Sequence, residues 1–330
     1  MLYQVIRPLL FSFDPERVHD FTLNTLKVLH HVGFFNLFKN QPAVPVQCMG
    51  LTFPNFVGLA AGLDKNGECL PAWGALGFGF VEVGTVTPRA QPGNPKPRLF
   101  RLVQQQAIIN RMGFNNKGVE HLITQIKAHS LRCPLGVNIG KNKDTPLNQA
   151  AQDYLVCFEK VYPYADYVTV NLSSPNTPGL QSLQYGESLN SILAPLKQAQ
   201  HKLSDKYSKK VPLVVKISPD LAKEELAPLI DHLVSLGIEG VIATNTTIKH
   251  AQEEGGLSGA PLFDPSTAIV SHIYNQVGDA LPIIAVGGVM GAEHAKAKLV
   301  AGAKLVQLYT GLIYRGPTLV RRIIKSVSYR

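Results

Sequence analysis

The sequence contains no long hydrophobic run, and this absence excludes one class of protein at the outset. None of its apolar stretches approaches the roughly 18 residues that a helix needs to cross a bilayer. The segment from Met1 to Phe13 also lacks the features of a secretory signal, because only Arg7 is basic and no small-residue cleavage site follows an apolar core. We therefore expect an intracellular chain that does not cross a membrane.

Cysteine is scarce, and the familiar hydrolytic motifs are missing. The chain has four cysteines, at positions 48, 69, 133 and 157, without CxxC spacing and without a histidine at metal-ligand spacing. We expect buried free thiols and no metal site.

There is also no HExxH motif and no Ser-His-Asp order, and most histidines lie in predicted helices, away from strand ends. Hydrolysis and a catalytic imidazole are therefore not the predicted chemistry.

Acidic residues are outnumbered by basic ones. Asp and Glu total 23 against 32 Lys and Arg, a formal net charge of +9. Such a field attracts polyanions and small anionic substrates. The basic residues are scattered, however, with local excesses only at Lys202–Lys210 and Arg315–Arg330. These two segments are either solvated faces or contacts to acidic lipid headgroups.

Short apolar, β-prone runs recur from Phe56 onward and alternate with helical patterns. Continuous Val, Ile and Leu runs with helices between them are typical of parallel strands that are covered on both faces. Eight runs favour a (β/α)8 TIM barrel over an open sheet. The predicted strands are Phe56–Gly62, Phe80–Thr87, Leu135–Gly140, Tyr167–Ser174, Pro212–Ser218, Gly240–Thr246, Pro282–Gly288 and Leu305–Gly311. We predict an α/β chain with a small N-terminal helical extension at residues 1–40 and the barrel at residues 41–330.

The segment before the barrel has an N-cap signal at Asp14-Pro15-Glu16, so a helix should follow. Its apolar residues and the cluster Gly33–Phe38 offer much apolar surface for so few residues. One interpretation is a helix packed on the barrel, and the other is an amphipathic pair lying in a membrane interface. Residues Val46 to Asn55 should form a hairpin across the barrel bottom, and Pro88 to Asn116 is an insertion of the kind that shapes a site.

Nearly every predicted strand ends in polar residues or glycine, which in a barrel gather at one mouth. Gly287-Gly288 and Tyr309-Thr310-Gly311 end the last two strands, where barrels commonly bind phosphate, although tight turns need glycine too. The loop Gly255–Gly259 could approach the same ligand. Lys65 and Lys216 either meet an anion in the mouth or extend to the rim.

Asparagines are the other polar residues at these ends. They offer both amide donors and carbonyl acceptors, which suits a planar, amide-rich ring better than a phosphate or carboxylate alone. They stand at positions 110, 138, 171, 176 and 245.

Five strings together resemble the dihydroorotate dehydrogenases, and the likeness covers essentially the full chain. They are GLAAGLDK at 58–65, INRMGFNN at 109–116, NIGKNK at 138–143, NLSSPNTPG at 171–179 and ATNTT at 243–247. The resemblance implies oxidation of dihydroorotate to orotate in pyrimidine biosynthesis, with FMN as cofactor. It places FMN at Ala61, Gly62, Leu63, Asp64, Lys65, Thr85, Asn138, Asn171, Lys216, Thr244, Gly259, Gly288, Tyr309 and Thr310. It places dihydroorotate at Lys65, Asn110, Arg111, Met112, Gly113, Phe114, Asn171, Asn176, Asn245 and Thr246.

By the same resemblance, Ser174 is the catalytic base that takes the C5 proton while a hydride leaves C6. Class 1 enzymes of the family have cysteine at this position, and this chain has none after Cys157. That departure, with the N-terminal extension, indicates class 2, in which the extension docks on the cytoplasmic side of the cell membrane and admits quinone. Arg101 is the candidate polar contact to quinone. Neither nucleic acid nor a metal or iron–sulfur partner subunit is expected.

Two other functions remain open from the residues themselves. A tRNA dihydrouridine synthase is another FMN barrel for which the positive charge would contact phosphates, but no cysteine sits at a suitable strand end to act as its acid. A flavin-binding module without turnover, whose N-terminal apolar surface recruits a partner, is the third hypothesis.

Overall fold

The computed structural model describes residues 2–34 and 44–327, and eight parallel strands form its centre. They close in the order β3 (Val57–Leu59), β4 (Phe80–Val86), β7 (Leu135–Ile139), β8 (Tyr167–Asn171), β9 (Leu213–Ile217), β10 (Gly240–Ala243), β12 (Ile283–Ala285) and β13 (Leu305–Leu308). Val306 of β13 pairs with Val57 of β3 and closes the barrel. All eight predicted strands and the TIM-barrel fold are thereby confirmed.

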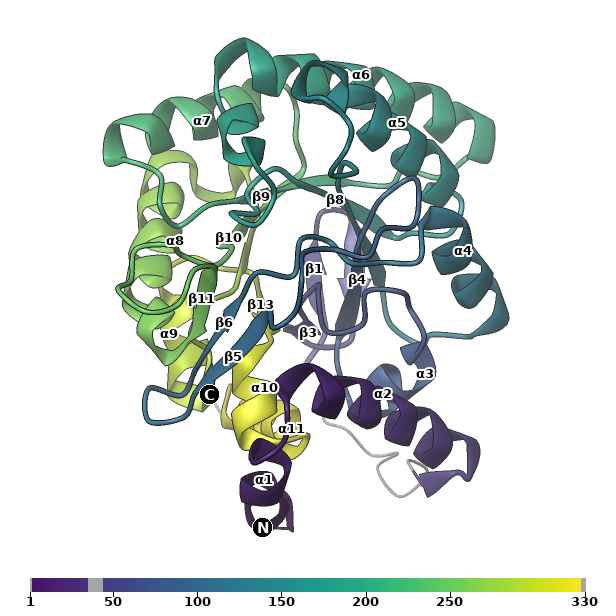
Figure 1. Cartoon of the computed structure of the whole chain (residues 1–330). Helices are drawn as coiled ribbons and strands as arrows, with labels where there is room; N and C mark the ends of the chain where they lie inside the picture. The colour runs from purple at the N-terminus through teal and green to yellow at the C-terminus, as the bar shows by residue number, and fades with distance from the viewer. Residues whose placement is uncertain (1, 35–43, 328–330) are drawn as a thin grey trace.

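Helices surround this barrel (Figure 1). The outer layer contains α3 (Leu70–Ala75), α4 (Val119–Ala128), α5 (Ala150–Val161), α6 (Gly186–Tyr207), α7 (Lys223–Ser235), α8 (Phe263–Val277), α9 (Ala292–Val300), α10 (Thr310–Arg315) and α11 (Thr318–Val327). The strands are buried along their whole length, as expected of parallel strands whose inner face fills the barrel and whose outer face packs on helices. The four cysteines are free, and all but Cys133 are buried.

The predicted hairpin across the barrel bottom is β1 (Val46–Cys48) paired with β2 (Leu51–Phe53). Phe53 is fully buried against Phe80 at the start of β4, with ring centroids 5.3 Å apart.

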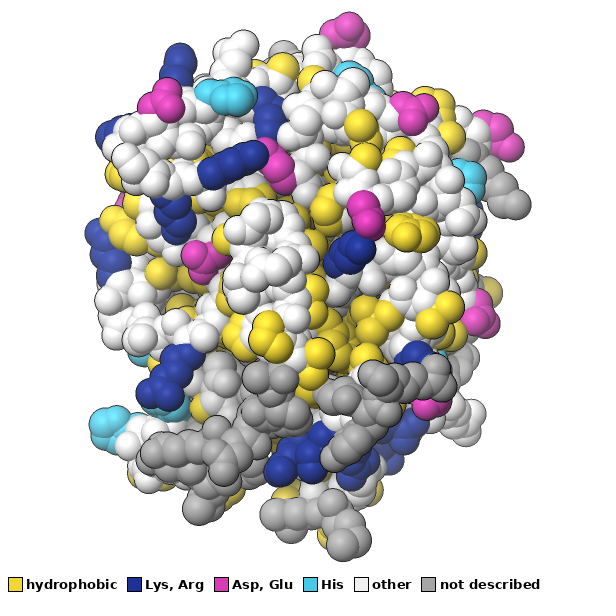
Figure 2. Space-filling view, turned by 180° about the vertical axis from the view of Figure 1, so that it is seen from behind, with side chains coloured by type: hydrophobic (Ala, Val, Ile, Leu, Met, Phe, Trp, Pro, Cys, Tyr) yellow, Lys and Arg dark blue, Asp and Glu magenta, His cyan; other side chains and the backbone are white. Residues whose placement is uncertain are grey.

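Figure 2 shows the molecule from behind, where cationic and anionic side chains are interspersed over most of the surface. A group of Lys and Arg side chains lies together in the lower part of that face, and elsewhere the scattered charge fits the sequence pattern.

The insertion after β4 is more regular than the sequence suggested. It contains β5 (Leu99–Leu102) and β6 (Ala107–Asn110), and β6 pairs in turn with β11 (Gly256–Gly259) from the loop after β10. This antiparallel sheet lies in front of the barrel strands in Figure 1. A segment far along the chain thus completes a sheet that no local pattern predicted.

The N-terminal extension forms two helices, α1 (Leu2–Phe11) and α2 (Pro15–His31). Asp14 caps α2 as predicted, since its carboxylate accepts a hydrogen bond from Arg17 N at 2.9 Å. Helix α1 was not predicted, and most of the cluster expected to pair with α2, residues 35–38, lies outside the described residues. None of the helices that the structure describes is long and apolar enough to cross a bilayer.

Candidate active site

The carboxyl ends of the barrel strands and the β5–β6–β11 sheet enclose a pocket with about 1000 Å³ of empty space, open solvent at its mouth included. Most of the predicted site residues line it. They are Ala61, Gly62, Lys65, Thr85, Asn110, Met112, Gly113, Phe114, Asn171, Ser174, Asn176, Lys216, Thr244, Asn245, Thr246, Gly259, Gly288, Tyr309 and Thr310. Residues from both ends of the sequence therefore converge on one cavity, as barrel topology requires.

Four predicted site residues do not line the pocket. Asp64 is buried beneath it, where its carboxylate accepts hydrogen bonds from Glu68 N, Cys69 N and Trp73 Nε1 at the start of α3. Leu63 is buried in the core, and Arg111 extends away to the carbonyl of Glu254, 3.1 Å from its Nη1. Asn138, the fourth, lies one layer below the pocket wall.

Asn138 organises the floor of the pocket from that position. Its Oδ1 accepts from Thr85 Oγ1 at 2.5 Å and from Asn171 Nδ2 at 3.2 Å, while its Nδ2 donates to Glu82 at 2.8 Å. Glu82 is fully buried inside the barrel and also accepts from Tyr167 Oη at 2.9 Å. Because buried amides in such a network can adopt only one orientation, Thr85 and Asn171 are held rigidly where they face the cavity.

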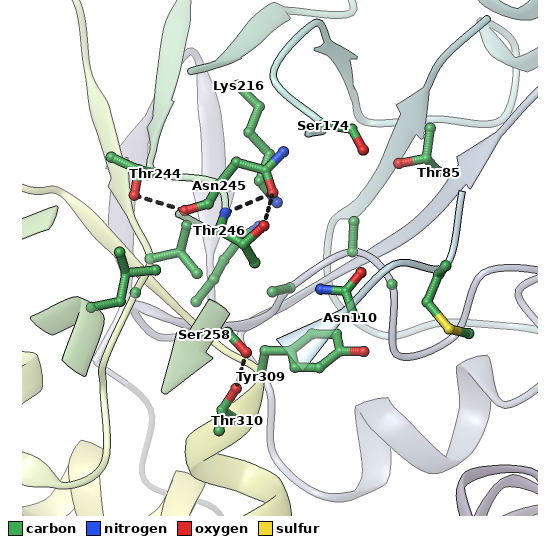
Figure 3. Close-up of a pocket in the computed structure, with 18 of the residues that line it drawn as sticks. Thr85, Asn110, Ser174, Lys216, Thr244, Asn245, Thr246, Ser258, Tyr309 and Thr310 are labelled. Atoms are coloured by element: carbon green, nitrogen blue, oxygen red, sulfur yellow. Dashed lines mark hydrogen bonds between the residues drawn. The ribbon is translucent and has the colours of Figure 1, made fainter. Parts of the chain in front are cut away.

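Ser174 lies three residues beyond the end of β8 and is 6% exposed. Its Oγ accepts a hydrogen bond from Asn176 N at 3.3 Å, a contact within the same turn. Among the described residues, no carboxylate or imidazole accepts its proton. The hydroxyl group therefore remains available to a ligand, and it points into the cavity that Figure 3 shows.

Amide side chains surround Ser174 and hold one another in place. Asn176 Nδ2 donates to Asn110 Oδ1 at 3.1 Å, and Asn245 Nδ2 donates to Ser173 Oγ at 3.0 Å. The Oδ1 atom of Asn245 accepts from the backbone N–H of Thr246 at 2.8 Å. These contacts leave donors and acceptors at the pocket surface in fixed directions, which suits a ring with amide edges.

The two lysines predicted at the mouth both line the pocket. Lys216 is 7% exposed, and burial lowers its pKa, although the negative charge of Glu82 opposes that shift. Within the described residues its ammonium makes no hydrogen bond or ion pair. Lys65 donates to the Gly62 carbonyl at 2.9 Å, and burial lowers its pKa to about 8. Two cationic groups that lose hydration in this way favour an anionic or electron-rich ligand.

At the end of the pocket opposite Ser174 and Lys216, glycines and hydroxyl side chains form part of the wall. Gly287 and Gly288 follow β12, and Ser258 Oγ lies 2.8 Å from Thr310 Oγ1. Figure 3 shows Ser258, Tyr309 and Thr310 across the cavity from Ser174 and Lys216. Burial raises the pKa of Tyr309 to about 12, so its phenol stays protonated. This end can offer backbone and hydroxyl donors to an anionic group.

The sequence did not identify every residue of the pocket wall. Ser258, Leu262, Val286, Val289 and Gln307 line it as well. Gln307 was visible as a polar residue inside the last predicted strand, and its Nε2 donates to Glu82 at 2.7 Å. Ser258 belongs to the glycine-rich loop that was expected to approach the ligand. The three apolar residues carried no signal, because their side chains resemble those of any barrel strand or turn.

Arg101, the predicted quinone contact, holds the junction between α1 and α2. Its Nη1 donates to the carbonyls of Phe13 at 2.8 Å and Phe11 at 3.3 Å, and its guanidinium lies 4.6 Å from the Phe11 ring centroid. Burial lowers its pKa. The residue therefore connects β5 to the extension.

Comparisons with known proteins agree with this geometry. Residues 43–330 match the family model described as dihydroorotate dehydrogenase. Proteins named dihydroorotate dehydrogenase (quinone) from Vibrio parahaemolyticus and Proteus mirabilis are each 55% identical to this chain, with 99% of the chain and 100% of the relative covered. These likenesses extend over the N-terminal helices as well as the barrel.

Solved structures show the same likeness in three dimensions. The dihydroorotate dehydrogenase of Eimeria tenella in complex with ferulenol superimposes with a TM-score of 0.88 at 40% identity, covering 95% of this chain and 90% of that one. Its ligand-free form gives a TM-score of 0.87 at 41% identity. The alternatives of a tRNA dihydrouridine synthase and of a module without turnover are therefore rejected.

Proposed function

The chain belongs to the dihydroorotate dehydrogenase family, in its quinone-dependent class, and from that premise we propose how its own residues perform the reaction. In this proposal FMN binds in the pocket, dihydroorotate lies against the flavin, and Ser174 is the base. The electrons leave to a membrane quinone. The observation that supports the proposal best is one cavity lined by the Ser174 hydroxyl, buried Lys216 and the glycine loop at Gly287-Gly288.

The residues present fit FMN. A Cβ added to Gly288 would stand 2.3 Å from Phe263 Cα, so only glycine allows the backbone to close this end of the pocket. The loop can then donate backbone N–H groups to a phosphate, as barrels commonly do after their seventh and eighth strands. At the other end, Lys216 and the fixed amides of Thr244-Asn245 can meet the polar edge of the ring system. The chemistry that bound FMN supplies is acceptance of a hydride and transfer of the electrons to quinone.

The substrate side of the pocket would orient dihydroorotate by its ring amides and carboxylate. We assign this to Asn110, Asn171, Asn176 and Asn245, with Lys65 as the positive charge. Four amides that are already paired with one another lose little freedom on binding, so the ring amides of the substrate are held without a large ordering cost. Met112 and Phe114, from the loop after β6, cover the same space and exclude water.

In the reaction Ser174 Oγ removes the proton from C5 while a hydride leaves C6 of dihydroorotate, giving orotate. A serine hydroxyl is a weak base at neutral pH, so its contribution depends on position and on a route for the proton. The protein provides the position through the turn that joins Ser174 to Asn176. Lys216 would stabilise negative charge that develops during reduction of the ring system.

For quinone, we propose access through the N-terminal extension, which would dock peripherally on the cytoplasmic side of the cell membrane. Among the described residues of α1, α2 and the segments that follow them, six large apolar side chains are more than half exposed: Val5, Leu9, Phe13, Phe21, Val28 and Val32. Other residues of α2, among them Leu23 and Leu26, pack against the core. A helix pair with one buried and one exposed apolar face fits an interface between protein and lipid.

Anaerobic addition of dihydroorotate to the purified holoprotein tests the central claim. We expect the visible absorption of bound oxidised flavin to bleach in a single turnover and to return when a soluble quinone is added. Protein that carries no flavin, or flavin that dihydroorotate leaves unbleached, would refute the proposal. Bleaching without recovery on quinone addition would refute only the proposed electron acceptor.

A further inference from the structure

Lys298, a buried lysine of α9, lies outside the pocket wall and has no part in the mechanism described above. Its side chain is fully buried, and its Nζ donates to Ser266 Oγ and, at 3.4 Å, to the carbonyl of Phe263. The ammonium also lies 5.4 Å from the centroid of the Phe263 ring. Within the described part of the chain, no carboxylate lies within ion-pairing distance of this ammonium. Burying an ammonium among neutral partners alone is costly, so its position needs a reason.

Ser266 connects Lys298 to the glycine loop of the pocket. Its Oγ, also fully buried, lies 2.6 Å from the carbonyl oxygen of Leu262 and 3.2 Å from that of Gly287. The Phe263 carbonyl lies 3.1 Å from the same oxygen. Because Lys298 donates to Ser266, the single proton of the serine hydroxyl is shared among these three carbonyls, of which that of Gly287 belongs to the loop. A Cβ on Gly287 would stand 2.6 Å from Ser266 Oγ, so the loop lies directly on the serine.

The direction of the Gly287 carbonyl determines what the next residue offers to the pocket. In a trans peptide the C=O and the following N–H point in opposite directions. The Gly287 carbonyl lies 3.2 Å from Ser266 Oγ, and Ser266 is not part of the pocket wall, so the N–H of Gly288, which lines the pocket, points away from Ser266. Among the described residues this N–H has no acceptor. The start of α8, at Phe263, lies beside the same loop and adds its dipole in the same sense.

We propose that Lys298 is a positioning residue for the phosphate of FMN, and that it acts from behind the Gly287–Gly288 loop through Ser266. Its ammonium would fix and polarise the loop so that the Gly288 N–H faces the phosphate. It would also supply the positive charge that the wall itself lacks at this end. Burial lowers the pKa of Lys298 to about 7, with Asp264 opposing the shift, and a bound dianion would favour the charged form. The inference rests on the proposed function, because it requires a phosphorylated flavin.

Binding of FMN and riboflavin to the flavin-depleted full chain tests this role, because the two ligands differ only in the phosphate. The quantity measured is the dissociation constant of riboflavin divided by that of FMN, both obtained from quenching of flavin fluorescence. A high ratio means that the protein prefers FMN. We expect the wild type to prefer FMN, and Lys298→Met to lower that preference roughly ten-fold with riboflavin affinity unchanged, the scale of a lost interaction with a charged group. Lys296→Met is the matched control, since it removes a lysine of the same helix that is only half-buried, and it should leave the ratio unchanged.

The outcomes distinguish the proposed phosphate site from the proposed role of Lys298. A wild type without preference for FMN would refute the phosphate site, and the inference with it. A wild type that prefers FMN, together with an unchanged ratio in Lys298→Met, would refute the inference alone. Equal weakening of both flavins would indicate a merely structural role and would also refute it. If Lys298→Met does not fold, Ser266→Ala carries the test: a lowered ratio supports the inference, and an unchanged ratio refutes it.

Discussion

Arg98 binds both carboxylate oxygens of Glu16, with Nη2 2.7 Å from Oε1 and Nε 3.1 Å from Oε2. The pair joins the start of α2 to the start of the β5 region, and both side chains are less than a tenth exposed. Burial alone would raise the pKa of Glu16, but hydrogen bonds from Arg98 and Lys96 outweigh it and the pKa is lowered. The extension is therefore anchored to the insertion that covers the active site.

Glu16→Gln should destabilise the protein by about 3 kcal/mol, because it leaves the Arg98 charge buried without its partner. The measurement is the free energy of unfolding in urea. Asp144→Asn is the control, since Asp144 forms an ion pair with Arg89 in which both side chains are mostly exposed. Such a pair contributes about 1 kcal/mol or less. If the two substitutions had equal effects, the Glu16–Arg98 pair would not be the anchor of the extension.

A second carboxylate, Glu68, connects α2 to the barrel, and its contribution to the stability of the protein depends on pH. Its oxygens lie 2.5 Å from Lys27 Nζ and 2.5 Å from Lys117 Nζ. Burial raises its pKa, but these hydrogen bonds and charges outweigh burial and lower the pKa to about 2. Its contribution to stability is therefore complete above the unfolded value of about 4.3 and is lost as the pH falls toward about 2.

We accordingly expect Glu68→Gln to lower the melting temperature at pH 6 and to differ less from the wild type at pH 3. Glu224→Gln, at an exposed position on α7, is the control and should follow the wild type at both pH values. A difference between wild type and Glu68→Gln that persists undiminished at pH 3 would contradict this assignment.

The barrel and most of its site could be predicted from the sequence, because both depend on local patterns. Each strand is a short apolar run, and each polar strand end is placed at the mouth by the topology alone. The resemblance then selected Ser174 from many polar residues. What could not be predicted depends on contacts between distant segments. The pairing of β6 with β11 joins residues 146 to 152 positions apart, and the Glu16–Arg98 pair joins residues 82 apart.

Asp64 shows a second limit of prediction from the sequence. A motif places it beside Lys65, which lines the pocket, yet its carboxylate turns inward to the N-terminus of α3. Adjacent residues in a turn point in different directions, and the hydrogen bonds that Asp64 accepts from Glu68 N, Cys69 N and Trp73 Nε1 hold its carboxylate away from the cavity. The motif therefore placed the loop correctly at the pocket. It did not show that Lys65 lines the pocket while Asp64 has a structural role.

Lys216→Met should make the reduction potential of bound flavin more negative. A buried ammonium favours the state in which negative charge has developed, and its removal withdraws that stabilisation. We expect a change of tens of millivolts, since about 30 mV corresponds to 1.4 kcal/mol for a two-electron couple. Lys206→Met, on an exposed part of α6, is the control for net charge. Equal potentials in wild type and Lys216→Met would remove Lys216 from this role.

Ser174→Ala tests the proposed base. FMN should remain bound, because the serine hydroxyl accepts only a backbone hydrogen bond from its own turn. Flavin reduction by dihydroorotate, followed by stopped-flow absorbance, should slow at least about 10²-fold, the range typical of losing a general base. Ser173→Ala, whose hydroxyl is fully buried and accepts from Asn245, serves as the neighbouring comparison and should slow reduction far less. Near-normal reduction in Ser174→Ala would show that another group takes the C5 proton.

The exposed apolar side chains of the extension give the last prediction, which separates lipid contact from general hydrophobicity. Leu9 on α1 and Phe21 on α2 are 64% and 61% exposed. The double variant Leu9→Ser and Phe21→Ser should lose most binding to lipid vesicles in a sedimentation assay. It should also slow flavin reoxidation by a long-chain quinone held in those vesicles. Reduction by dihydroorotate should stay unchanged, because neither side chain lines the pocket.

The matched control is Val300→Ser, which removes an even more exposed apolar side chain, 79% accessible, from the end of α9. Apolar area leaving water contributes about 25 cal/mol per Å², so two large exposed side chains of the extension should matter more to membrane affinity than any single residue elsewhere. If the control lost vesicle binding to the same extent, the membrane contact would not be specific to the extension. If neither variant lost binding, the extension would not be the docking surface, and quinone would have to reach the flavin by another face.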